Sequence, residues 1–66
     1  MKYYFVSYAL CRFGDSEHSF SNDYFQCDGI FVVNEFEYFL SQKYSLRMVS
    51  IISKQEVSQE EYEANL

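Results

Sequence analysis

The stretch Lys2-Tyr3-Tyr4-Phe5-Val6-Ser7-Tyr8-Ala9-Leu10, KYYFVSYAL in one-letter code, decides the fold. It is rich in aromatic and β-branched residues without helical spacing, which predicts a long strand over residues 2–13. Alternate residues of a strand share a face. The odd face holds Tyr3, Phe5, Ser7, Ala9 and Cys11. The even face holds Tyr4, Val6, Tyr8 and Leu10. Because both faces carry large side chains, each needs a cover.

Length and composition limit how those faces can be covered. The chain has 66 residues, which predicts a single domain that buries only about 60% of its unfolded surface. Aromatic residues make up 21% of the sequence, with two Gly and no Pro. We expect an ordered chain whose stability depends on an apolar core or on association.

A hairpin follows the first strand. The segment Gly14-Asp15-Ser16-Glu17 is typical of a turn, because glycine is permissive and Asp and Ser bond locally to the backbone. A second, more polar strand is predicted from Ser19 to Cys27, and Asp28-Gly29 ends it. The long polar stretch from Asp15 to Asp23 leaves the register of this strand open.

A helix is predicted over residues 35–44. Asn34 is the expected cap, with Glu37 reaching back to it and Val33 packing on Tyr38. Three apolar residues at helical spacing would form its buried stripe: Phe36, Phe39 and Leu40.

A third strand is predicted over residues 46–53, LRMVSIIS, and a short terminal helix after Ser58-Gln59-Glu60-Glu61. We expect Tyr62 and Leu66 to turn toward the body. The order is strand, strand, helix, strand, short helix. The predicted fold is therefore α+β, a ββαβ unit with a three-stranded antiparallel sheet in the spatial order second, first, third strand, and one helix on one face.

The small Ser7 and Ala9 leave room for a helix, so we assign the odd face to the helix side, joined by Val49 and Ile51. The even face is then left for a partner. The predicted interaction surface is Tyr4, Val6, Tyr8, Leu10, Met48 and Ile52. The alternative is that the C-terminal segment around Val57, Tyr62 and Leu66 folds back over part of this face.

Charge and targeting signals restrict the partners. The net charge is −5 and the five basic residues are scattered, which disfavours nucleic acid and anionic membranes and favours basic partners. The longest apolar run, residues 30–33, is too short for a membrane span, and no signal peptide is evident. We expect a soluble cytoplasmic protein in which Cys11 and Cys27 stay reduced and pack as small hydrophobes.

No arrangement of residues predicts catalysis or a cofactor. His18 is the only histidine, and a Cys11–His18 pair would lack a third, orienting group. Cys11, His18 and Cys27 do not match a zinc pattern. The acidic pairs at 35/37 and 60/61 suit helix starts, and the two glycines are isolated, which excludes a phosphate-binding loop. We predict no catalytic, metal, cofactor or small-molecule site, with a minimal cysteine enzyme as the alternative.

Two nucleic-acid hypotheses remain. Tyr4 and Tyr8 on an open face have the spacing that stacks bases, but the basic rim is missing. In the second hypothesis, acidic side chains imitate the phosphates of a nucleic acid. These residues are Asp15, Glu17, Asp23, Asp28, Glu56, Glu60, Glu61 and Glu63. Such a mimic would inhibit a host DNA- or RNA-binding defence protein.

The opening KYYFVSY, the helix entry VVNEFEYFL and the segment SQEEY at 58–62 resemble small proteins encoded by bacteriophages, prophages and other mobile elements. The resemblance implies an accessory protein that binds a host or defence protein, for instance of the anti-CRISPR or anti-restriction type. We therefore predict a non-enzymatic protein-interaction module that binds a host protein or forms a homodimer.

Overall fold

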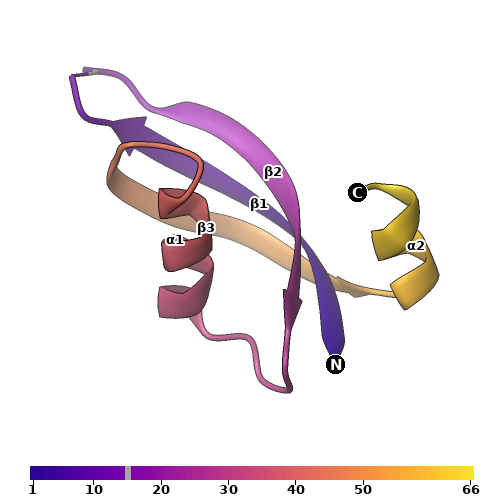
Figure 1. The fold of residues 1–66 in the computed structure, drawn as a ribbon. Coiled ribbons are helices and arrows are strands. Elements are labelled where there is room, and N and C mark those ends of the chain that lie inside the picture. The colour runs from indigo at the N-terminus through magenta and orange to yellow at the C-terminus, as the bar shows by residue number, and fades with distance from the viewer. Residues whose placement is uncertain (15) are drawn as a thin grey trace.

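The computed structural model describes residues 1–14 and 16–66 and has five elements. They are β1 (Lys2–Arg12), β2 (Ser19–Cys27), α1 (Val33–Ser41), β3 (Leu46–Val57) and α2 (Gln59–Ala64). The strands form one antiparallel sheet in the order β2-β1-β3 (Figure 1). The predicted α+β fold with its ββαβ order and terminal helix is confirmed. No helix within the described ranges is long and apolar enough to cross a membrane.

One glycine lies in each of the two loops that precede and follow β2. Gly14 has φ +93° and Gly29 has φ +96°, conformations that residues with a Cβ rarely adopt. Gly29 therefore ends β2 where the sequence predicted a break. The role predicted for Asp15 in the first turn lies outside the described residues.

α1 begins two residues earlier than predicted. Its cap is Val32, whose backbone carbonyl accepts hydrogen bonds from the amides of Glu35 (3.1 Å) and Phe36 (3.2 Å). No side chain caps this end, so the expected cap at Asn34 is wrong: Asn34 already lies inside the helix and is exposed. The predicted stripe is correct, because Phe36 and Leu40 are fully buried and Phe39 packs beside them.

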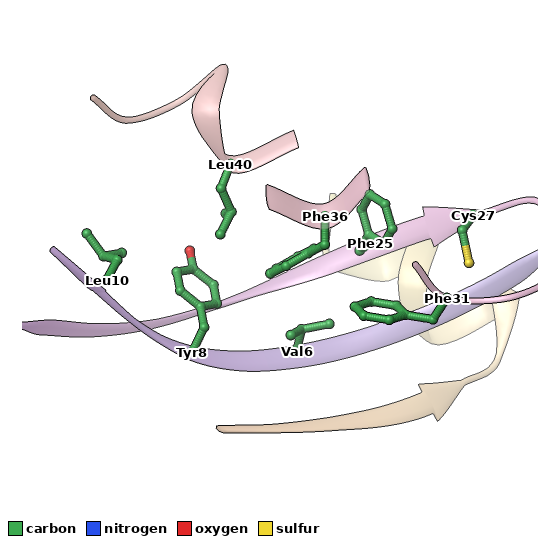
Figure 2. Packing of buried hydrophobic residues seen from close by; sticks show 8 residues of the cluster. All are labelled: Val6, Tyr8, Leu10, Phe25, Cys27, Phe31, Phe36 and Leu40. Atoms are coloured by element: carbon green, nitrogen blue, oxygen red, sulfur yellow. The ribbon is translucent and has the colours of Figure 1, made fainter. Parts of the chain in front are cut away.

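α1 covers the even face of β1, not the odd face that we assigned to it. Val6 and Tyr8 are 0% exposed and Leu10 is 2% exposed, and they meet Phe36 and Leu40 from the helix (Figure 2). The half-buried Tyr4 packs against the same cluster. The predicted docking surface of Tyr4, Val6, Tyr8 and Leu10 is therefore part of the interior.

The strand register explains this outcome. Tyr4 lies opposite Phe25, and Phe25 makes edge-to-face contacts with Phe31 and Phe36 at ring-centroid distances of 5.8 and 5.2 Å. The even face thus brings large side chains from two strands and the connecting segment under one helix. The odd face, with Ser7 at its centre, has less apolar volume to bury.

β3 contributes to both faces. Val49 lies opposite Leu10 and Ile51 opposite Tyr8, and both pack against the core under α1. Their predicted place on the helix side is correct, although they join the even face and not the odd one. β3 is also longer than predicted and continues to Val57.

α2 covers one end of the odd face (Figure 1). The Ser58 side chain accepts a hydrogen bond from the amide of Glu61 at 3.1 Å, which confirms the predicted cap. The Tyr62 ring packs on Tyr3 with centroids 4.9 Å apart. The C-terminal segment therefore covers the odd face near the start of β1, not the even face. Leu66 is 84% exposed, so its expected packing on the body is wrong.

Replacement of Tyr8 by alanine tests this core. We expect Tyr8→Ala to lower the free energy of unfolding by about 3–5 kcal/mol, because it leaves a large cavity. That loss is comparable to the whole stability of a domain of this size, about 3–10 kcal/mol. Urea unfolding followed by circular dichroism measures it.

Tyr38 supplies the control, because it is 70% exposed on α1. Tyr38→Ala should change the free energy of unfolding by less than about 0.5 kcal/mol. Equal effects of the two substitutions would contradict the assignment of the even face to the core.

Candidate docking surfaces

The half of the odd face that α2 leaves uncovered carries a group of exposed apolar side chains. Phe20 is 75% exposed, Ile52 is 59% exposed and Met48 is 45% exposed. They flank Ala9 of the central strand, which is itself buried, and we call the three exposed residues the open patch. Exposed apolar residues gathered on one face are typical of sites where proteins dock.

Strand pairing places each member of the open patch. Phe20 on β2 lies directly opposite Ala9, and Met48 on β3 lies opposite Cys11. Ile52 is the extra residue of a β-bulge, because Ile51 pairs with Tyr8 and Ser53 with Ser7. Ile51 packs against the core, whereas Ile52 is 59% exposed, so the bulge turns Ile52 away from the face that α1 covers.

The open patch overlaps only partly with the predicted surface. Met48 and Ile52 are exposed, but they lie on the opposite side of the sheet from Tyr8. Sequence reasoning missed Phe20. The signal was present in the alternation of β2, where Phe20 and Phe25 must lie on opposite faces, but the unknown hairpin register concealed which of them faces outward.

A groove of about 460 Å³ runs along the outer edge of β2. Its lining residues come from β2, from α1 and the turn after it, and from the C-terminal segment: Asn22, Asp23, Tyr24, Phe39, Lys43, Tyr62, Asn65 and Leu66. Consecutive strand residues point to opposite faces, so a groove that touches residues 22, 23 and 24 lies along the edge of the strand and not on either face. We call it the edge groove.

A polar chain lies behind the edge groove. The Tyr8 hydroxyl donates to Asp23 Oδ2 at 2.6 Å, and Lys43 Nζ donates to Asp23 Oδ1 at 2.6 Å. Burial, followed by the hydrogen bond to Asp23, raises the pKa of Tyr8 well above its ordinary value of 10. The buried hydroxyl is thus satisfied, and β1, β2 and the turn after α1 are joined through one carboxylate.

The two cysteines are buried, and the histidine lies at the surface. Cys11 is 1% exposed and its sulfur accepts a hydrogen bond from Arg47 Nη2 at 3.2 Å, whereas His18 is exposed. Burial raises the pKa of the Cys27 thiol, which lowers its reactivity. Neither cysteine forms a disulfide, as expected. Residues 1–14 and 16–66 hold no group of three His, Cys, Asp or Glu side chains that is suited to a metal ion.

Comparison with models of protein families, with curated proteins and with solved structures gave no match. The geometry of the two surfaces is therefore the basis for any functional assignment.

The raised pKa of Tyr8 predicts a pH dependence of stability. Above pH 10 the unfolded chain releases the tyrosine proton while the folded chain keeps it, so folding stability is present below pH 10 and falls as the pH rises further. The slope for this one group approaches about 1.4 kcal/mol per pH unit. Tyr8→Phe should remove that part of the decline.

Urea unfolding of wild type and Tyr8→Phe between pH 8 and pH 11 measures the difference between the two proteins, which cancels the titration of groups common to both. The stability advantage of wild type should shrink above pH 10. A difference that stays constant across this range would contradict the role of the neutral hydroxyl.

Proposed function

We propose that this chain is a non-enzymatic protein-binding module that docks an amphipathic helix of a basic partner on the open patch. The observation that carries the proposal is the cluster of Phe20, Met48 and Ile52, which is exposed on a sheet face whose other end α2 already covers. An accessory role in a mobile element, acting on a host protein, belongs to this proposal and rests on the sequence resemblance.

The shape of the odd face favours a helix as the bound element. The central strand carries only small side chains at Ser7 and Ala9, and their partners on β3, Ser53 and Ser50, are small as well. On β2 the large Phe20 lies opposite Ala9. Helices pack on sheets at about 10 Å, and small central residues allow that approach. From Ser7 to Cys11 the strand spans roughly 13 Å, which corresponds to about nine residues of helix.

Charge favours a basic partner over a second copy of the chain. The net charge of −5 repels a like molecule and attracts a cationic one. α2, at the opposite end of the same face, adds Glu60 and Glu61 in its first turn. A helix with leucines on one face and lysines along its flanks matches the apolar patch and the net negative charge of the chain.

A fluorescein-labelled helical peptide of alternating Leu and Lys pairs is a suitable probe. We expect Phe20→Ser and Ile52→Ser each to weaken its binding about five- to tenfold, because each substitution removes apolar area from the contact. Ile30→Ser and Tyr38→Ser are matched controls, since Ile30 is 83% and Tyr38 70% exposed elsewhere on the surface. Fluorescence anisotropy measures the four dissociation constants.

Salt dependence separates the proposal from the alternative of an acidic nucleic-acid mimic. Apolar docking should persist at about 0.5 M salt, where exposed charges are screened within a few ångströms. Equal losses in all four variants, or binding that disappears with salt and with Glu60→Gln, would favour the mimic and overturn the proposal.

A further inference from the structure

We propose that the outer edge of β2 is a second binding site, which takes an extended segment of another protein as a fourth strand of the sheet. The inference extends the proposed protein-binding role but concerns a different surface from the open patch. It rests on the contrast between the two sheet edges and on the lining of the edge groove.

The two edge strands of the sheet differ in whether they carry features that prevent another strand from pairing with them. β3 has two register shifts, at Ile52 and at Arg47, and carries Lys54 and Glu56. Bulges and charged side chains are the devices by which proteins protect an exposed edge. β3 is therefore a protected edge.

β2 lacks these devices. Its nine residues pair with β1 in an unbroken register, without proline, lysine or arginine. Its one charged residue, Asp23, is neutralised by Lys43 at 2.6 Å and turned toward α1. Within the described ranges β1 is the only neighbour of β2, so the outward backbone groups of a regular strand are available for pairing.

The edge groove has the shape that a single strand requires. Phe39 and Lys43 bound it on the α1 side, and Tyr62, Asn65 and Leu66 bound it on the other side. A strand that pairs with β2 would turn alternate side chains to these two walls, whereas a helix has no such two-sided alternation. Strand addition gains affinity from main-chain hydrogen bonds and specificity from such alternate pockets.

The same walls argue against a second copy of this chain as the occupant. A symmetric pair of β2 strands centred on Asp23 would bring the walls of one molecule against those of the other. A register shifted away from the walls would leave only a short end of β2 to pair, residues 19–21 or 25–27. The net charge of −5 opposes self-association as well. The occupant is therefore an extended, uncharged or basic segment of a different protein.

The probe for this site is the peptide Lys-Val-Thr-Val-Thr-Val-Lys, added to ¹⁵N-labelled protein. Amide hydrogen exchange of the outward-facing residues between Phe20 and Gln26 should slow about tenfold when the peptide is present at ten times its dissociation constant. The control peptide has the same side chains and N-methylated central amides, which cannot donate hydrogen bonds. It should leave exchange unchanged.

Two protein variants give a matched comparison. Asn22 and Asn34 are both exposed, but only Asn22 lines the groove. Asn22→Lys places a charge at the edge and should weaken peptide binding about threefold or more, whereas Asn34→Lys adds the same charge elsewhere and should not. Ile52→Ser should bind this peptide normally, so failure at the edge groove is distinguishable from failure at the open patch.

Several results would overturn the inference: no slowed exchange at millimolar peptide, slowing on β3 in place of β2, or equal binding of the N-methylated peptide. A dimer of the free protein in light scattering, with the outward β2 amides already protected, would show that a second copy takes the site and would also overturn it.

Discussion

The constraint on which this structure depends is that one nine-residue helix covers one face of a three-stranded sheet. α1 lies on the face that has the most apolar volume, so Tyr8, Phe36 and Leu40 form its centre. Tyr8 places the strictest requirement on this core, because its ring is buried and its hydroxyl therefore needs a hydrogen-bond partner. Asp23 meets that requirement, and Lys43 in turn balances the carboxylate. The core thus fixes β2 against β1 and ties the turn after α1 to both.

The order of elements was predictable because it depends on local signals. Ser58 and the following glutamates define α2, and Phe36 with Leu40 defines the buried stripe of α1. The start of α1 was less predictable, since Val32 caps it through its backbone carbonyl alone. A backbone cap has no side-chain signature, whereas Asn34 offered a side chain that the fold does not use.

The choice of face could not be made from the first strand alone. The small side chains of Ser7 and Ala9 indicated that a helix could pack closely on the odd face. Burial, however, follows the total apolar area that all three strands bring to one side. That sum depends on the register, which places Phe25 opposite Tyr4 and Ile51 opposite Tyr8. A register shifted by one residue would have turned Phe25 outward and Phe20 inward.

The proposed docking of a partner helix uses the part of the odd face that the chain itself leaves uncovered. α2 fills one end, where Tyr62 contacts Tyr3 and Glu61 accepts a hydrogen bond from the Tyr24 hydroxyl at 3.2 Å. The other end keeps Phe20 and Ile52 at the surface. An apolar surface of this kind lowers solubility unless the rest of the molecule compensates, and the net charge of −5 does so. A charged group beside the patch is Arg47, which donates a hydrogen bond to the sulfur of Cys11 opposite Met48.

β2 connects the two proposed surfaces. Phe20 belongs to the open patch, and Asn22, two residues along the same strand and on the same face, lines the edge groove. A partner that lays a helix on the patch and continues as a strand along β2 would make the second contact intramolecularly. Its effective concentration there would be on the order of millimolar, so two weak contacts would combine into a much tighter one. For a chain of 66 residues with one small core, this is the physical route by which a modest surface reaches useful affinity.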